Sequence, residues 1–449
     1  MKIRYIANAC FVLRLASGKT ILTDPWFEGP CQQTWWNFPP LDPDLLAEVR
    51  ALRPDYLYIS HLHHDHLHPQ SLTHFDPATP VIIGAMNTPN LANALRGAGF
   101  SNLLPFGFEA RAPLPGAGCE LVLFRDFHGN TLGDDSVLDY DLDTSIYLFD
   151  GDGARVFNAV DNTIRPEDAA RIAARYGAPD VAMLPYASAS LYPMAMADYD
   201  DAAKAAARER IRARTSVNFA EVGRGLGTGH VIPAGGEYVL GGSVAAQSRF
   251  LPQPLEPQLR GALEAAGVEP GRLAKLYPGD QLDSATGAVA QNPKAPMRGF
   301  SDADRAAYAL SLADRRETCA DLTLPDGAEF EWRRAMAKAA RNFHDRRRKL
   351  GLDLDLDVYI EAVAGPRRER MFLFKLALDS DAAGFREAAE DSGRARLAYR
   401  IDQKMLFCLL TGLLSWNAME ASALLEVRRS PDLYQHDAHR SIVHFTLLS

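Results

Sequence analysis

The sequence predicts an α/β protein with a metal site at the end of one strand, followed by a smaller α+β module. Short β-rich runs alternate with helical patterns over the first half of the chain, which is typical of sheets covered by helices. A dense run of histidine and aspartate follows one apolar run directly. After residue 300 the pattern changes to two longer strand-like runs and a packed helix.

The first 250 residues contain the alternating segments, with Gly, Pro and Asp at the expected turns. Strand-like runs occur at residues 3–6, 11–15, 20–23, 56–60, 80–83, 120–124, 143–149, 154–160 and 180–184. Helical patterns occur at residues 43–52, 89–97, 166–176 and 196–214, the last with a continuation to 223. Interleaving of this kind predicts sheets sandwiched by helices.

The chain is long enough for two or three domains, with 449 residues of which 47% are hydrophobic. Proline-rich stretches at residues 251–258 and 291–297 mark boundaries. We therefore predict a catalytic domain over 1–250, a linker or arm over 251–300 and an accessory domain over 301–449. Ser301 has the features of a helix N-cap, with Asp304 three residues later.

The composition excludes several classes of protein. A net charge of −9 argues against nucleic acid as a partner. The apolar run at 406–414 is too short to cross a membrane. The N-terminus enters a strand pattern with no visible signal peptide, and the five cysteines are isolated. We expect a cytoplasmic enzyme with a small-molecule substrate, and a homodimer is an open alternative to a monomer.

The most informative motif is the run H-L-H-H-D-H after residues 56–60. It supplies His61, His63, Asp65 and His66 in an H-x-H-x-D-H pattern. Residues two apart in extended backbone project to one side, so the first two imidazoles can serve one metal. Asp65 and His66 come from the next turn and face a second point nearby. One short loop can therefore feed two adjacent metals.

These ligand types define the chemistry expected. Neutral imidazole suits zinc and iron, and a carboxylate adds charge at the second position. Two close cations lower the pKa of a shared water, or bind dioxygen if they are redox-active. We predict two divalent metal ions, with iron favoured and zinc or manganese as alternatives.

The motif resembles the metal-binding loop of the metallo-β-lactamase superfamily. The wider sequence resembles the metallo-β-lactamase-like part of CMP-N-acetylneuraminate hydroxylase, through I-R-Y-I-A-N-A-C from Ile3, T-D-P-W-F-E-G-P from Thr23 and F-N-A-V-D-N-T from Phe157. The likeness extends over most of residues 1–245. It implies an αββα sandwich, which periodicity alone would not predict.

One departure from that branch concerns electron supply. The animal hydroxylase begins with a Rieske iron–sulfur domain, which needs C-x-H and C-x-x-H pairs. Here no cysteine lies within a few residues of another Cys or of a His. A redox reaction would therefore take electrons from a separate reductase or ferredoxin.

The resemblance implies further ligands on other loops. His128 lies where the superfamily places the third imidazole of the first metal. Asp161 ends a strand and matches the bridging carboxylate, and we predict that Asp65 and Asp161 are also the catalytic carboxylates. The last ligand is open between His230, Glu237 and no protein ligand at all.

Other polar and aromatic residues lie in neighbouring loops. Asp24 and His64 are predicted to support the ligands, and His68 either supports them or is an extra ligand. The predicted substrate-binding residues are Trp26, Trp35, Trp36, Tyr186, Ser188, Ser190 and Tyr192. For the tryptophans, stacking on a sugar or base competes with a purely structural role as buried anchors.

The C-terminal part shows strand-like residues 353–361 and 370–379 and a helical segment at 400–414. This pattern resembles a sterol-carrier-like module, and an accessory lid or a dimerisation domain is the alternative. We expect no metal ligand after residue 300.

Two functions fit these observations. One is an iron-dependent oxygenase that hydroxylates a small polar substrate such as a nucleotide-linked or amino sugar. The other is a zinc- or manganese-dependent hydrolase that attacks a phosphoester, lactone or amide. The resemblance to the hydroxylase favours the first, and the superfamily at large favours the second.

Overall fold

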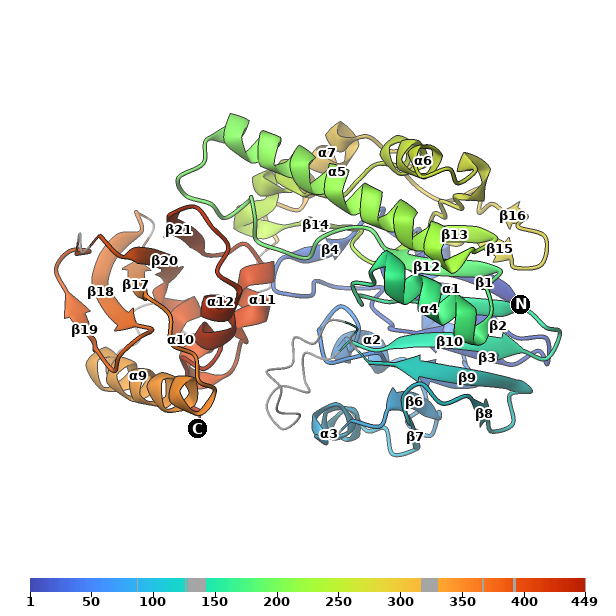
Figure 1. Cartoon of the computed structure of the whole chain (residues 1–449), viewed down its shortest axis with the longest axis horizontal. Helices are drawn as coiled ribbons and strands as arrows, with labels where there is room; N and C mark the ends of the chain where they lie inside the picture. Colours follow the sequence, from blue (N-terminus) through green and yellow to red (C-terminus); the bar gives the residue numbers. More distant parts are fainter. Residues whose placement is uncertain are drawn as a thin grey trace.

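The computed structural model describes residues 1–86, 88–125, 127, 143–315, 330–365, 367–390 and 393–448. These residues form an N-terminal module with two large sheets and a C-terminal module with one five-stranded sheet (Figure 1). The two modules lie side by side, with the second at the left of the view.

The first large sheet contains the strand that precedes the histidine-rich loop. Its strands are β1 (Lys2–Ala7), β2 (Cys10–Arg14), β3 (Thr20–Thr23), β5 (Tyr56–Tyr58), β6 (Val81–Gly84), β7 (Leu103–Phe106), β15 (Gln281–Asp283) and β16 (Val289–Ala290). Their order is β16-β15-β1-β2-β3-β5-β6-β7. The pairs from β3 to β7 are parallel, and the pairs from β16 to β3 are antiparallel.

The second large sheet has six strands in the order β13-β12-β11-β10-β9-β8. They are β8 (Ala112–Leu114), β9 (Cys119–Phe124), β10 (Ser145–Asp150), β11 (Arg155–Asn158), β12 (Val181–Pro185) and β13 (His230–Ala234). Strands β11, β12 and β13 run parallel to one another. A two-stranded ribbon of β4 (Trp35–Asn37) and β14 (Tyr238–Leu240) completes the module.

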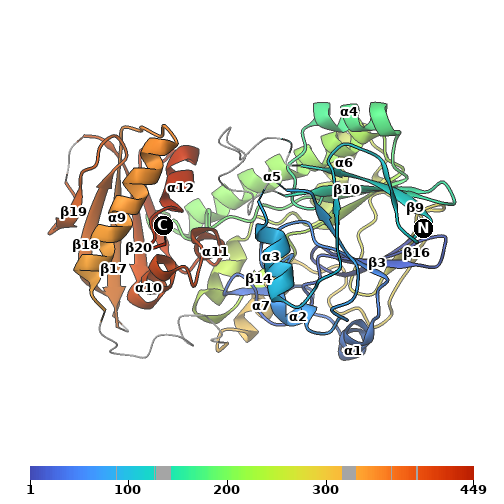
Figure 2. The same ribbon diagram turned by 90° about the horizontal axis from the view of Figure 1, so that it is seen from below.

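Buried apolar side chains join the layers. One cluster fills the space between the two sheets, with members such as Ile3 and Tyr58 from the first and Leu148 from the second. A second cluster joins the six-stranded sheet to its helices, and a third joins Leu57 to the helix residue Leu95. Figure 2 shows helices on both sides of the strands. The αββα expectation is therefore confirmed.

The helices of the sandwich cover its two outer faces. The first large sheet carries α1 (Pro43–Ala51), α2 (Pro69–Leu72) and α3 (Asn90–Gly97). The second carries α4 (Pro166–Tyr176), α5 (Asp201–Leu226) and α6 (Glu256–Ala265). Helix α4 has the predicted bounds. Helix α5 begins later than predicted because the side chain of Asp200 accepts a hydrogen bond from Ala203 N and caps it.

The segment predicted to be a linker or arm is packed into the N-terminal module instead. Residues 251–254 are buried, α6 packs against α5, and β15 pairs with β1 through Ile3 and Leu282. Helix α7 (Asp302–Ser311) also lies against this module, beside β14. Its start at Ser301 is confirmed, because the Ser301 hydroxyl accepts from Asp304 N.

The C-terminal module has a mixed sheet in the order β19-β18-β17-β20-β21, with helices packed on it. Its elements are α9 (Trp332–Lys349), β17 (Leu356–Ala364), β18 (Glu369–Ala377), β19 (Ala383–Arg386), β20 (Ala395–Asp402), α10 (Gln403–Thr411), α11 (Trp416–Ala421), β21 (Glu426–Ser430) and α12 (His436–Ile442). The predicted α+β character is confirmed. The segment predicted as one helix over 400–414 contains the end of β20 and all of α10.

Hydrogen bonds in both directions join the two modules. Thr34 Oγ1 donates to Ser422 O at 2.8 Å, and Trp35 Nε1 donates to Ala421 O at 2.8 Å. Val427 N in β21 donates to Ala195 O at 2.8 Å. Because these groups are buried or partly buried, their loss would leave carbonyls unsatisfied. Among the helices that the structure describes, none has both the length and the apolar surface needed to span a membrane.

The packing of residues 281–283 is testable by mutation. Leu282 is fully buried between the large sheets, so Leu282→Ala should lower the free energy of unfolding by about 2–5 kcal/mol. Its partner Val289 is 36% exposed, so Val289→Ala should change it by less than about 0.5 kcal/mol. Chemical denaturation followed by circular dichroism measures both. Equal, small effects of the two substitutions would mean that this segment is a loose arm.

Candidate metal centre

The carboxyl ends of the parallel strands bring the site together. Strand β5 pairs in parallel with β3, and β12 pairs in parallel with both β11 and β13. The loops that follow parallel strands in one sheet emerge at the same edge. The histidine-rich loop follows β5, and Asp161 follows β11. The sandwich therefore places these two loops opposite each other.

The first donor group consists of His61, His63 and Asp161. One possible ligand atom from each lies within 4.8 Å of the other two. His61 Nε2 and His63 Nδ1 are 2.8 Å apart. His61 is buried, whereas His63 and Asp161 are partly exposed. Two imidazoles and one carboxylate thus converge at one point.

The second donor group consists of Asp65, His66 and, again, Asp161. Their ligand atoms also lie within 4.8 Å of one another. His66 Nε2 is 3.3 Å from Asp65 Oδ2 and 3.3 Å from Asp161 Oδ2. Because both groups contain the Asp161 carboxylate, they are adjacent. The H-x-H-x-D-H loop thus supplies two residues to each group, as its spacing predicts.

Asp24 and Ser60 orient two of the histidines through contacts to their Nδ1 atoms. The buried Asp24 carboxylate accepts from Ser60 N and from Ser60 Oγ, both at 2.8 Å, and from His66 Nδ1 at 3.0 Å. The Ser60 hydroxyl in turn lies 2.9 Å from His61 Nδ1. Since these partners engage Nδ1 of both rings, Nε2 is the nitrogen of each ring that faces the donor groups. The predicted supporting role of Asp24 agrees with this geometry.

The charges of the second group call for a cation. Burial by itself would lower the pKa of His66, but the carboxylates of Asp161, Asp65 and Asp24 outweigh it and raise that pKa well above its ordinary value. Three carboxylates around one buried ring are stable only if positive charge lies among them. A proton on Nε2 is one source, and a divalent cation at the same point is another. The imidazole–carboxylate donor set fits such a cation.

Three residues beside the donor groups were not predicted from the sequence. Ser60 is one, and Gln32 is another, whose Nε2 donates to Asp65 Oδ1 at 3.3 Å. Asp143 Oδ1 lies 3.2 Å from His61 Nε2. It immediately precedes Thr144 and β10, which is antiparallel to β9, so the start of β10 lies at the edge where β9 ends. That antiparallel relation is the signal that could have indicated Asp143.

The remaining predicted ligands have different outcomes. His128 lies outside the described residues. His230 does not fit the prediction, because it begins β13 opposite Val181 at the start of β12. The donor groups lie beyond the other ends of these strands, and His230 Nε2 instead packs against Gly287. Glu237 is buried in an ion pair with Lys275. Neither residue belongs to the donor groups of the described chain.

The loop after β13 approaches the centre through glycine. Gly235 has φ +72°, and a Cβ added there would lie 3.3 Å from Asp161 Oδ1. A side chain at this position would be strained and would press on the shared carboxylate. The chain therefore passes close to Asp161 without contributing a side chain there.

The other predicted supporting histidines take different positions. His64 is exposed. His68 is buried, and its Nδ1 accepts from Ser71 N at 3.3 Å as the cap of α2. The pKa of His68 is lowered to about 4, mainly because the ring is buried. His68 therefore stabilises the end of the ligand loop as a neutral ring.

The structure favours the anchoring alternative for two of the tryptophans. Trp26 is fully buried, with Nε1 donating to Gly29 O at 3.2 Å. Trp35 is 2% exposed and stacks on Tyr238, with ring centroids 3.5 Å apart. Trp36 is partly buried and packs against the cluster around Phe38. Stacking of a ligand on Trp26 or Trp35 would require these rings to leave their packed positions.

The four predicted substrate-binding residues after β12 lie in different environments. Tyr186 is buried, with the Lys275 ammonium 5.4 Å from its ring centre. Ser188 and Ser190 are partly exposed. Tyr192 points toward the C-terminal module, since Arg429 lies 5.1 Å over its ring. The Ser190 hydroxyl already accepts a hydrogen bond from Tyr192 N at 3.2 Å.

Tyr238 is a further residue near the donor groups. It is fully buried, and its hydroxyl has no hydrogen-bond partner among the described residues. Burial raises the pKa of Tyr238, and the negative charges of Asp65 and Asp161 add to the increase. A neutral phenol hydroxyl with a free proton therefore lies within electrostatic range of both carboxylates.

Comparison with known proteins agrees with the fold and the motif. Residues 2–210 match the family model described as the beta-lactamase superfamily domain. A protein of Mycobacterium tuberculosis (strain ATCC 25618 / H37Rv), provisionally named a Rieske 2Fe-2S iron-sulfur protein, is 28% identical over 340 residues. That alignment covers 70% of this chain and 60% of the relative, so the chain spans less than two thirds of its length.

A second relative is the cytidine monophosphate-N-acetylneuraminic acid hydroxylase of Danio rerio. It is 34% identical over 119 residues, which cover 23% of this chain and 18% of that protein. The expected resemblance to this hydroxylase is confirmed for that part of the chain.

Solved structures similar to this chain include isothiocyanate hydrolase from Delia radicum gut bacteria. It has 18% identity and a TM-score of 0.43, and the alignment covers 63% of this chain and 99% of that one. CmlA, a diiron β-hydroxylase from Streptomyces venezuelae, has 16% identity and a TM-score of 0.43. That alignment covers 65% of this chain and 54% of CmlA. At scores this low, neither neighbour's reaction is transferred to this chain. The family match, the αββα layers and the H-x-H-x-D-H loop agree in relating residues 2–210 to the beta-lactamase superfamily domain.

Proposed function

We propose that this chain is an iron-dependent oxygenase with a dinuclear site, which hydroxylates a small polar substrate such as a nucleotide-linked or amino sugar. The observation that supports it most is the pair of adjacent donor groups that share Asp161. Two imidazoles with one carboxylate, and one imidazole with two carboxylates, are donor sets that suit iron. Neither set, among the described residues, contains a thiolate.

The residues around the site would hold two cations in fixed positions. His61, His63 and Asp161 would bind one, and Asp65, His66 and Asp161 the other. Asp24 and Ser60 would keep the rings in the tautomer that binds through Nε2. Two bound iron ions would supply the activation of dioxygen. In the overall reaction one oxygen atom enters a C–H or N–H bond and the other leaves as water, with two electrons and two protons consumed.

The relatives support the reaction and the electron supply. One relative is named as a hydroxylase of a nucleotide-linked sugar, and another carries a Rieske iron–sulfur centre in its name. The five cysteines of this chain are isolated from one another and from histidine. We therefore propose that a separate reductase or ferredoxin supplies the electrons.

The hydrolase alternative uses the same donor groups. Zinc or manganese would supply hydroxide at neutral pH, which attacks a phosphoester, lactone or amide. The partly exposed Asp161, with 26% of its side chain accessible, would be the carboxylate nearest to such a substrate. The two reactions differ in their need for dioxygen, which makes them separable by experiment.

Substitutions of residues in the donor groups should lower the metal content, whereas a substitution outside them should not. Protein purified without chelators should bind about two metal ions per chain. His63→Ala should lose about half of the metal, because it removes a ligand of one group, and Asp161→Asn should lose most of it. His230→Ala, at the far end of β13, should keep the wild-type content. Elemental analysis of folded protein measures all four, and loss of metal in His230→Ala would contradict the geometry.

Asp24 offers a test of ligand orientation. Asp24→Asn keeps the size of the side chain but removes the charge that holds His66 Nδ1 and Ser60. The affinity for metal should fall about 10–100-fold, whereas the fold should persist. Competition with a chromophoric chelator gives the affinity. Unchanged affinity would mean that Asp24 has only a structural role.

The reaction is tested with isotopically labelled oxygen. Iron-loaded protein would be incubated with CMP-N-acetylneuraminate, a reduced ferredoxin and ¹⁸O₂. An oxygenase should place ¹⁸O in the product and form none anaerobically, and Asp161→Asn should be inactive. Product formed without dioxygen or reductant, with zinc alone and with oxygen from water, would establish the hydrolase instead.

A further inference from the structure

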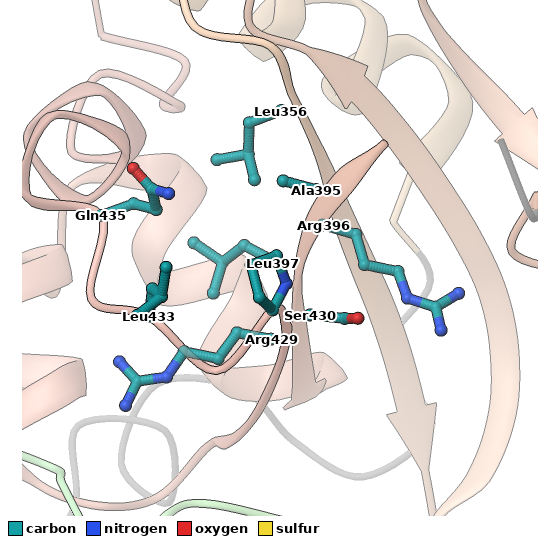
Figure 3. Close-up of a pocket in the computed structure, with 9 residues that line it drawn as sticks. Leu356, Ala395, Arg396, Leu397, Arg429, Ser430, Leu433 and Gln435 are labelled. Carbon is teal, nitrogen blue, oxygen red and sulfur yellow. The ribbon is translucent and has the colours of Figure 1, made fainter. Parts of the chain in front are cut away.

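The C-terminal module contains a groove that the proposed reaction does not use. It lies between α9 and the edge strand β19, and its volume is about 430 Å³, within the range of small-molecule sites. Figures 1 and 2 show α9 lying along this side of the sheet. A different hollow of the module, between β20 and β21 (Figure 3), holds about 10 Å³, roughly one water molecule.

The apolar part of the lining consists of small and aromatic side chains. Ala337 and Ala340 line it from α9, three residues apart and hence on one helix face. Phe374 comes from β18 and Phe385 from β19. Ala383 stands at its edge and is exposed. Small side chains opposite two aromatic rings leave room for a flat or short apolar group.

One buried polar side chain of the lining has no hydrogen-bond partner among the described residues. His344 is 4% exposed, and neither of its ring nitrogens has a hydrogen-bond partner among the described residues. The carboxylate of Asp381 lies near the ring, with Oδ1 at 4.0 Å from Nδ1. That carboxylate already pairs with Arg347 and Arg348. A buried imidazole without hydrogen bonds costs free energy, which a ligand in the groove would recover.

The charged residues at the rim leave one cation uncompensated. Arg348 pairs with Asp345 at 2.5 Å and with Asp381 at 2.7 Å. Arg341 also lines the groove and is exposed, and it forms no ion pair with the residues that the structure describes. An anionic group would therefore find its partner at Arg341.

We propose that this groove binds a small organic carboxylate with an apolar body, such as an aryl carboxylate. The body would lie between the alanines of α9 and the rings of Phe374 and Phe385. The carboxylate would accept hydrogen bonds from Arg341 and from the His344 ring. The site is independent of the metal centre, so it stands whichever reaction the N-terminal module performs.

The test uses benzoate and its neutral analogue benzyl alcohol as probes, with binding to the full chain measured by calorimetry. Benzoate should bind at least about tenfold more tightly than benzyl alcohol, because a charge-assisted hydrogen bond is lost with the alcohol. Arg341→Gln should weaken benzoate about tenfold and leave benzyl alcohol unchanged. Arg334→Gln, an exposed cation on α9 outside the groove, is the matched control and should change neither.

Two further variants separate the groove from other surfaces. Ala383→Trp fills the groove from an exposed position, so the fold should survive and benzoate binding should be lost. His344→Leu should weaken benzoate while the circular dichroism spectrum stays native. No benzoate binding at millimolar concentration, equal affinity for the two probes, or unchanged affinity in both Arg341→Gln and Ala383→Trp would overturn the proposal.

Discussion

Both donor groups of the N-terminal module depend on the position of one carboxylate, Asp161. It lies where the parallel strands β11 and β12 end, facing the loop that follows β5 across the sandwich. From there it reaches both donor groups at once. Shared in this way, it would neutralise part of the repulsion between two cations bound at these groups. The two sheets, their packed interior and the glycine at position 235 are all needed for this position.

The buried network behind the ligands is the second constraint. Asp24 is fully buried, so its charge is expensive unless every oxygen is satisfied. The backbone N–H and hydroxyl of Ser60 and the imidazole of His66 donate hydrogen bonds to the two oxygens. The network fixes ring orientation before any metal arrives. Binding then requires little rearrangement, which favours tight and specific sites.

Local patterns predicted much of this centre, and tertiary relations account for what they missed. The H-x-H-x-D-H spacing and the strand before it are local, so the loop and its two donor pairs could be predicted. His230 was one of the open alternatives for the last ligand, but β13 starts at that residue, and parallel pairing places strand starts at the edge opposite the donor groups. Gln32 and Asp143 reach the ligands only through the register of distant elements, which no local pattern encodes.

The same distinction applies to the fold. Helix starts with their own capping side chains depend on neighbouring residues. The start after Ser301 was predicted in this way, whereas the helix capped by Asp200 was predicted to begin too early, at residue 196. Proline-rich residues 251–258 interrupt regular structure without leaving the core, since residues 251–254 are buried. Proline content reports a break in helix or strand rather than exposure, so the predicted linker proved to be part of the module.

The most direct test of the central claim is anomalous X-ray diffraction from crystals of protein purified with its native metal. Data on both sides of the iron absorption edge should show two anomalous peaks, one at His61 and His63 and one at Asp65 and His66, with Asp161 in contact with both. A single peak, or peaks that do not touch Asp161, would contradict a dinuclear centre built on this shared carboxylate.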